Sequence, residues 1–273
     1  MIASIGRPCL TETLDDISNS SMLPNEVIIV LPKNSEFVLP DSYEENGLNI
    51  RLLYGQKGQV KQRQVGLLHC KYDIIIQLDD DIRFDSMVLH SLVHEVSNNS
   101  NIIVSPLFYD LHTNLCISGT KVGQNRFLKF LYGTNAEKEV LGVGYVSSIG
   151  LAIRPSSLKD RDLIRSEWLP GGCMSYHKKF STKGSKILSP DGKFYGEDLI
   201  NSHIMREMGA ELFFSTKLGV RAEVTSVRAL KDAITHFKSM IFIQQMNHGK
   251  IFFVKTLFFC LIRYVRSWLL KSS

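Results

Sequence analysis

The sequence lacks paired cysteines and a secretory leader. Its five cysteines are scattered, and none forms a C-x-x-C pair: Cys9, Cys70, Cys116, Cys173 and Cys260. This odd, dispersed set argues against a disulfide framework and against a zinc site, and it fits a reducing compartment. The first residues, MIASIGRP, have neither the charged start nor the apolar stretch of a signal peptide. We therefore expect a cytoplasmic protein.

The sequence also lacks a strong net charge, an internal repeat and a low-complexity tract. Its formal net charge is +5, and Lys and Arg are concentrated in residues 178–193 and 250–271. Such a mild excess suggests anionic partners without indicating nucleic acid. With 44% hydrophobic residues over 273 positions, the chain can bury a sizeable core, as one large domain or as two packed halves.

Strand-like and helix-like segments alternate over the first 110 residues. The strand-like runs are MIASI, NEVIIVLP, LNIRLLY, YDIIIQL and NIIVSPLFY, and helical spacing separates them in residues 10–17, 58–70 and 85–96. Beyond them we expect a strand in GYVSSIGLAIR, a loop over 177–193, a helix over 197–208, strands AELFFST and RAEVT, and a helical tail. Repeated β-α-β units predict an α/β, Rossmann-like, mostly parallel sheet flanked by helices, with a C-terminal helical extension.

Three consecutive aspartates, Asp79, Asp80 and Asp81, directly follow the apolar strand YDIIIQL. In open α/β sheets ligands bind beyond the carboxyl ends of the strands. Clustered carboxylates repel one another unless a cation or hydrogen-bond donors compensate, and an oxygen-only site favours Mg²⁺ or Mn²⁺. We predict that Asp79 and Asp81 bind the metal. The alternative is a solvated turn with capping aspartates.

A second acidic pair, Glu197 and Asp198, opens the predicted helix of GEDLINSHIMREMG. Acids in a first helical turn are typical of ordinary capping, so the pair alone is weak evidence for a site. The order of parts strengthens it: strand-terminal aspartates, a segment with Gly171 and Gly172, a basic loop, and then Gly-Glu-Asp. We expect the loop, residues 177–193, to close over an anionic ligand.

The motifs SIGRP, KGQVKQRQVGL, QLDDDI, LPGGCMSY and GEDLINSHIMREMG, in this order, resemble the family 2 glycosyltransferases over roughly residues 1–225. These are enzymes of the GT-A fold that use nucleotide-sugar donors and generally invert the anomeric centre. The resemblance implies that Asp79, Asp80 and Asp81 hold the metal and the donor ribose or diphosphate. It also implies that Asp198 is the catalytic base and that Glu197 supports it. Further donor contacts are expected from Ser4, Arg7 and Arg63; an exposed helical arginine is the alternative for Arg63.

The same resemblance implies a metal-dependent hexosyltransferase that uses Mn²⁺ or Mg²⁺ and a nucleotide sugar, UDP-type, in polysaccharide or glycolipid assembly. The acceptor would be a glycan or a lipid-linked molecule, and no nucleic acid would take part. The expected division is a donor-binding half (1–110), an acceptor-binding and catalytic half (111–226) and a tail (227–273).

The sequence departs from the family pattern at two places. Pro32 and Lys33 follow the second strand, and no histidine follows the Glu-Asp helix. His203 lies within that helix and is expected to be a packing or surface residue. A nucleotidyltransferase and a non-catalytic sugar-binding relative are the competing interpretations.

The tail has an amphipathic helical pattern. One side gathers Phe253, Val254, Leu257, Phe258, Leu261, Tyr264, Val265 and Trp268, and the other side Lys255, Arg263 and Arg266. Charges in mid-segment argue against a membrane span and favour a helix lying in the lipid interface, at the inner face of the membrane. The alternative is a terminal helix docked on the catalytic domain.

Overall fold

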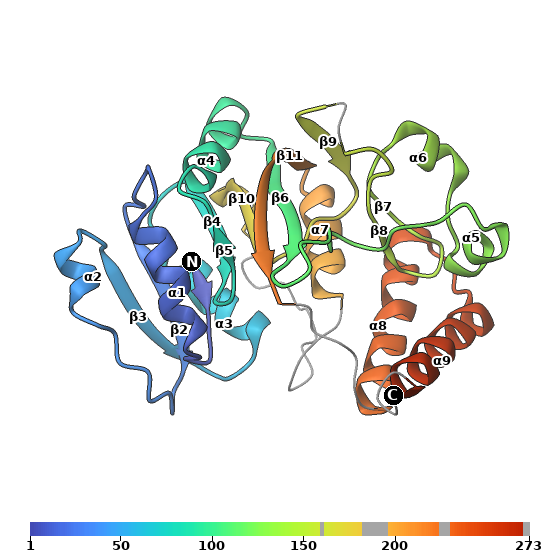
Figure 1. Ribbon diagram of the computed structural model, residues 1–273, viewed down its shortest axis with the longest axis horizontal. Helices are drawn as coiled ribbons and strands as arrows, with labels where there is room; N and C mark the ends of the chain where they lie inside the picture. The colour runs from blue at the N-terminus through green and yellow to red at the C-terminus, as the bar shows by residue number, and fades with distance from the viewer. Residues whose placement is uncertain (159–160, 182–195, 224–229, 270–273) are drawn as a thin grey trace.

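A computed structural model describes residues 1–158, 161–181, 196–223 and 230–269. Within them, nine strands form one mixed sheet flanked by helices (Figure 1). Its strands are β1 (Ile2–Ala3), β2 (Val27–Pro32), β3 (Ile50–Gly55), β4 (Ile74–Asp79), β5 (Arg83–Phe84), β6 (Ile102–Asp110), β9 (Leu163–Ser166), β10 (Cys173–His177) and β11 (Glu211–Ala222). The helices are α1 (Cys9–Ser18), α2 (Ser42–Glu45), α3 (Gln59–His69), α4 (Val88–Asn98), α5 (Arg126–Tyr132), α6 (Ala136–Leu141), α7 (Glu197–Glu207), α8 (Leu230–His248) and α9 (Phe253–Leu269).

The order of strands is β3-β2-β1-β4-β10-β6-β11-β5, with β9 also paired to β11. The first four strands are mutually parallel, as the β-α-β alternation predicts, and β6 is parallel to β11. β10 lies between β4 and β6 and runs antiparallel to both. The α/β fold with a large central sheet is therefore confirmed, and its second part is more mixed than the sequence alone predicts.

Three segments differ in detail from the sequence-based expectation. GYVSSIGLAIR contains two short strands, β7 (Tyr145–Val146) and β8 (Ala152–Ile153), which pair with each other across a turn that includes Gly150. Residues 211–216 of AELFFST and 221–222 of RAEVT lie in one strand, β11, with an irregular register against β6 between Ser215 and Gly219; residues 224–225 lie outside the described residues. Of the predicted loop, the 3-10 turn Lys178–Phe180 is described; residues 182–195, and with them most of the predicted lid, lie outside the described residues.

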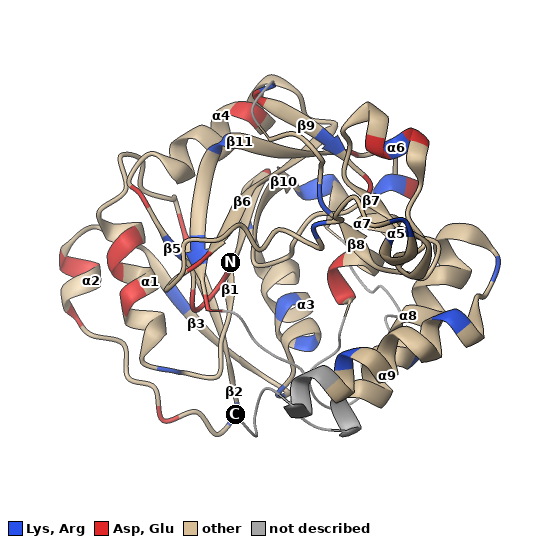
Figure 2. Cartoon of the chain, turned by 45° about the vertical axis from the view of Figure 1, so that its right-hand side comes forward, with Lys and Arg blue, Asp and Glu red and all other residues tan. Residues whose placement is uncertain are grey.

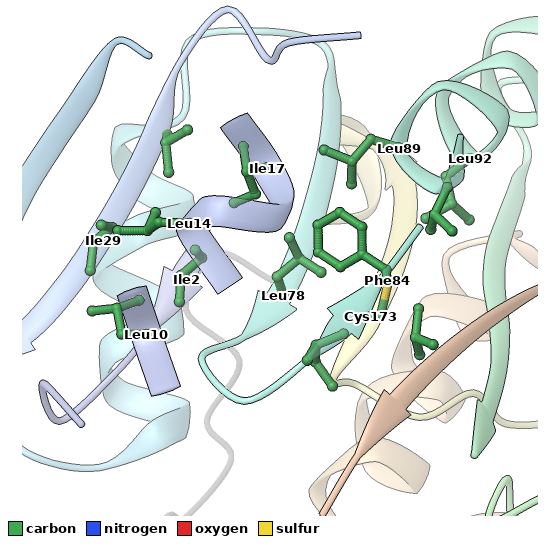
Figure 3. Packing of buried hydrophobic residues seen from close by; sticks show 14 of the residues in the cluster. Ile2, Leu10, Leu14, Ile17, Ile29, Leu78, Phe84, Leu89, Leu92 and Cys173 are labelled. Carbon is green, nitrogen blue, oxygen red and sulfur yellow. The ribbon is translucent and has the colours of Figure 1, made fainter. Parts of the chain in front are cut away.

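Hydrophobic residues cover both faces of the sheet because successive strand side chains point to opposite faces. All six residues of β2 are buried; Ile29 lies on the face covered by α1, whereas Val30 packs on the opposite face with α3. Figure 3 shows the apolar cluster on the face of Ile29, with Leu10 and Leu14 of α1 near Ile29, and Leu92 of α4 farther along the sheet. The central strands are thereby fixed between two apolar layers.

A third cluster joins α5, β7, α8 and α9 beyond the end of the sheet (Figure 1), with Leu131, Tyr145, Met240 and Phe259 among its members. The two predicted halves share the central sheet, because β6 pairs with both β10 and β11. The division into 1–110, 111–226 and 227–273 stays a prediction. Within the described residues, no helix is both long and apolar enough to cross a membrane.

Candidate active site

The aspartate triplet stands at the carboxyl end of β4, beside a cavity of about 960 Å³. Residues far apart in the sequence line this cavity, among them Ser4, Arg7, Asp79, Asp81, Glu197 and Asp198. The backbone N–H of Asp79 donates to the carbonyl of Gly172 over 2.7 Å, which joins the triplet to the segment entering β10. Both acidic motifs thus meet at one cavity.

Asp80 is turned into the protein, with only 4% of its surface exposed. Ser4 Oγ donates to its Oδ2 over 2.5 Å, and the Arg7 guanidinium donates to its Oδ1. The Thr13 hydroxyl donates to the carbonyl oxygen of Asp80 over 3.0 Å. Two predicted donor-binding residues, Ser4 and Arg7, therefore both contact a third, Asp80, and Asp80 anchors the turn from which its neighbours project.

Asp79 and Asp81 retain partial exposure at the cavity, 24% for each side chain. Asp79 Oδ1 accepts from Gln59 Nε2 over 2.9 Å and from Arg63 Nη2 over 2.6 Å. Asp81 Oδ2 accepts from Arg7 Nη2 over 3.0 Å. Burial, and then the nearby charge of Asp79, raise the pKa of the Asp81 carboxyl, while Arg7 opposes this shift. A cation between the two carboxylates would relieve the repulsion.

Arg63 of α3 connects the two acidic motifs. Its Nη2 contacts Asp79, and its Nη1 donates to Glu197 Oε1 over 2.5 Å. Burial alone would lower the pKa of Arg63, but the surrounding carboxylates raise it further, so the guanidinium stays charged. Burial likewise raises the pKa of Glu197, against the opposing effect of Arg63. Because Arg63 is only 4% exposed, the alternative of an exposed helical arginine is wrong; its donor contact stays a prediction.

Gly171 and Gly172 form the wall between Asp79 and Asp198. A Cβ at Gly171 would overlap Asp198 Oδ1 and lie 3.2 Å from Arg63 Nη1, and a Cβ at Gly172 would lie 3.0 Å from Asp79 Oδ2. The Gly171 carbonyl accepts from Gln77 Nε2 over 2.6 Å and from Arg63 Nη2 over 3.2 Å. The absence of side chains at these two positions lets the two acidic motifs share one cavity.

Asp198 occupies the first turn of α7, as the helix predicted over residues 197–208 requires. The turn begins at Gly196, whose φ of +84° lies in the left-handed region that favours glycine. A Cβ at Gly196 would lie 2.6 Å from Ile243 Cδ1 of α8. Helix α8 therefore packs directly against the segment that carries Glu197 and Asp198.

Two cavity residues come from the tail and have no signal in the sequence as site residues: His236 of α8 and Arg263 of α9. Burial, together with the positive charge of Arg263, lowers the pKa of His236 to about 4. His203, by contrast, lies against α8, with its Nδ1 3.3 Å from Asn247 Oδ1. This contact fits the expectation of a packing or surface residue.

The carboxylates of Asp79 and Asp81 fit a hard divalent cation only as part of its coordination sphere. Among the described residues, no group of three or more His, Cys, Asp and Glu side chains is arranged to hold a metal. Two carboxylates facing a cavity nevertheless suit Mg²⁺ or Mn²⁺ when substrate phosphates and water supply the remaining oxygens. The donor chemistry is consistent with the predicted site.

Residues 6–160 match the family model described as glycosyl transferase family 2. The chain belongs to glycosyltransferase family 2. The match includes the aspartate triplet and covers more than half of the chain, so the family recognised from the motifs, and with it the expected enzyme class, is confirmed. No curated protein sequence matches this family 2 chain.

Three solved structures share the fold of this glycosyltransferase-family chain. GalNAc-T7 with UDP, GalNAc and Mn²⁺ has 16% identity and a TM-score of 0.57, covering 83% of this chain and 43% of that one. TarS residues 1–349 from S. aureus has 14% sequence identity and a TM-score of 0.53, and the match covers 96% of this chain and 69% of that one. The mannosyltransferase PcManGT from Pyrobaculum calidifontis, with GDP-Man and Mn²⁺, has 15% sequence identity and a TM-score of 0.51, and the match covers 98% of this chain and 68% of that one. The chain thus spans less than half of GalNAc-T7, and the GT-A fold is confirmed.

Proposed function

We propose that the protein transfers a sugar, with inversion at the anomeric carbon, from a nucleotide-sugar donor to an acceptor hydroxyl, in a reaction that needs a divalent metal. The observation that carries this proposal is the shared cavity of Asp79, Asp81 and Asp198, separated by the side-chain-free wall of Gly171 and Gly172. A donor diphosphate and an acceptor hydroxyl need opposite sides of one such space. Family membership supports the reaction class.

Asp79 and Asp81 would hold Mn²⁺ or Mg²⁺ together with the donor diphosphate. The ion would stabilise the negative charge that grows on the leaving phosphate. Solved structures of similar fold support this assignment, since that of GalNAc-T7 contains UDP and Mn²⁺ and that of PcManGT contains GDP-Man and Mn²⁺. Arg7, which already contacts Asp80 and Asp81, fixes the triplet and offers a further positive charge at the donor.

In the transfer step, the acceptor oxygen forms a bond to the anomeric carbon while the bond from that carbon to the diphosphate oxygen breaks. The acceptor proton passes to the Asp198 carboxylate, and the electron pair leaves with the nucleoside diphosphate. General-base catalysis of this kind contributes about 10²- to 10⁴-fold in rate. Glu197, bonded to Arg63 and buried, positions the first turn of α7 and with it Asp198.

The competing interpretations lose support. Family membership argues against a nucleotidyltransferase. A non-catalytic relative has no need of both acidic motifs, and here both line the cavity. For the acceptor we propose a glycan or a lipid-linked molecule in polysaccharide or glycolipid assembly, and for the donor a UDP-type sugar. We also expect contact with the inner face of the membrane through the tail.

The substitution Asp198→Asn tests the reaction. It keeps the size of the side chain but replaces the carboxylate by an amide, which cannot accept the proton. Turnover of the preferred nucleotide sugar should fall by about 10²-fold or more, while donor affinity stays near normal. Asp162→Asn, on an exposed pair with Lys217, is the matched control. If the Asp198→Asn protein keeps more than about a tenth of kcat, Asp198 is not the base.

A further inference from the structure

Helix α9 has two distinct sides. Thr256, Phe259 and Cys260 are buried, and the latter two join the cluster that contains Met240 of α8. The remaining apolar residues face outward, with 79% of Val254 exposed and about half of Phe258 and Leu261. The helix is therefore docked along one narrow side and leaves the predicted apolar side uncovered. Docking and an exposed apolar side occur together in this helix, although the sequence presents them as alternatives.

Helix α5 extends this exposed region. It packs beside α9 (Figure 1), where the ammonium of Lys255 lies 4.3 Å from the centre of the Phe130 ring. Phe130 is 69% exposed and Phe127 61% exposed, although both are large aromatic residues. The α5–α9 surface is thus formed by Phe127, Phe130, Val254, Leu257, Phe258 and Leu261. It combines two segments more than a hundred residues apart, and no pattern in either segment alone predicts it.

The segments that form this surface contain no acidic residue. Neither residues 111–136 nor the chain after Asp232 has an Asp or a Glu. The chain after Asp232 nevertheless carries six basic residues, which exceed the formal net charge of +5 of the whole protein: Lys238, Lys250, Lys255, Arg263, Arg266 and Lys271. In Figure 2 the described part of α9 has blue segments and no red ones. Beside α5, Glu139 of α6 is paired with Lys129 of α5 over 2.6 Å. An apolar surface whose own two helices carry basic residues and no acid is complementary to an anionic lipid interface.

The same helices reach the catalytic cavity. Ile243 of α8 packs against Gly196, next to Asp198, and Arg263 of α9 lines the cavity itself. Whatever covers the outer side of α9 therefore lies next to the side of the cavity where Asp198 would receive the acceptor. The aspartate triplet, by contrast, follows β4 of the central sheet.

We infer that the α5–α9 surface binds the headgroup region of an anionic lipid bilayer and brings the acceptor side of the cavity to the membrane. This inference identifies the second helix in the contact and the lipid charge; its consequence for a lipid-linked acceptor rests on the proposed function. A second copy of the chain is the main competitor for the surface. Two identical basic faces would repel each other, which favours lipid.

Co-sedimentation with vesicles tests the inference on the full chain. Vesicles of phosphatidylcholine with phosphatidylglycerol should bind the protein at low salt, and vesicles of phosphatidylcholine alone should bind it at least tenfold less, because each basic residue near an anionic surface contributes about fivefold. The double substitution Phe258→Ser with Leu261→Ser should weaken binding to the anionic vesicles at least tenfold. So should Phe127→Ser with Phe130→Ser, which leaves the tail intact.

The matched control is Val38→Ser with Leu68→Ser, two exposed apolar residues in the first half of the chain, which should bind like the unchanged protein. Equal binding to both kinds of vesicle would overturn the anionic preference, and no binding to either would overturn the membrane contact. Unchanged binding after the α5 substitutions would restrict the contact to the tail and overturn the two-helix surface. A dimer in sedimentation velocity that the α9 substitutions dissociate would identify the second copy as the occupant.

Binding of UDP with Mn²⁺, followed by thermal shift without vesicles, keeps this test separate from the proposed function. A protein that binds nucleotide and metal but no vesicle would lose only the membrane inference. A protein that binds vesicles but no nucleotide would lose the proposed function and keep the lipid surface.

Discussion

At the scale of single residues, Gly171 determines where the Asp198 carboxylate can stand. Its added Cβ would meet the end of a flexible side chain, so Gly171→Ala should displace Asp198 Oδ1 without disrupting the backbone. We expect kcat to fall about tenfold or more, since small displacements of catalytic groups are costly, while the melting temperature changes little. Steady-state kinetics and calorimetry on the same protein separate the two effects.

Gly123→Ala is the matched control, because a Cβ there would meet no atom within 4 Å. Its turnover should equal that of the unchanged protein. If Gly171→Ala also leaves kcat unchanged, Asp198 does not need its present position. If Gly171→Ala instead unfolds the protein, the segment of Gly171 and Gly172 cannot adjust to the added methyl group. The loss of activity could then not be assigned to the Asp198 carboxylate alone.

At the scale of elements, Gln244 holds the two tail helices in place. This fully buried side chain donates from Nε2 to the carbonyl of Ile149 over 3.1 Å and to Thr256 Oγ1 over 2.8 Å, and its Oε1 accepts from the Phe252 N–H over 2.7 Å. Gln244→Leu would leave these groups buried without a partner. We expect the free energy of unfolding to fall by about 1–3 kcal/mol in urea titrations.

The neighbouring Gln245 is exposed, and Gln245→Ala should stay within about 0.5 kcal/mol of the unchanged protein. Because α8 and α9 supply His236 and Arg263 to the cavity, Gln244→Leu should also raise KM. Equal stability of the two variants would mean that packing alone positions the helices.

At the scale of the whole molecule, donor and metal binding should appear as added stability. A ligand at about a hundred times its Kd adds about 2.7 kcal/mol. For a chain of this size that corresponds to roughly 5–10 °C in Tm. UDP with Mn²⁺ should give such a shift, and removal of the metal by a chelator should abolish most of it. Asp81→Asn should lose the Mn²⁺-dependent part, whereas Asp41→Asn, on the exposed start of α2, should keep it. A full Mn²⁺ response in Asp81→Asn would exclude Asp81 as a ligand.

Local signals in the sequence predict much of this molecule, and distant pairings account for the rest. An apolar run that ends in acids identifies β4 and its aspartates, and Gly-Glu-Asp before helical spacing identifies α7. The five residues of β10 have no such pattern, because the strand exists only through its pairing with β4 and β6. His236 and Arg263 reach the cavity through packing of α8 and α9, which periodicity alone does not specify.

The position of β10 also has a consequence for the order of assembly during synthesis. β4 and β6 emerge from the ribosome early, but each lacks its neighbour on one edge until Cys173–His177 is available to fill the space between them. Translation of residues 111–172 takes about 3–12 s at typical rates of 5–20 residues per second. During that interval both strands present unpaired edges, which are sites of non-native association. The nascent chain is therefore most vulnerable to aggregation after its first half is made, and a chaperone that covers strand edges would act in this window.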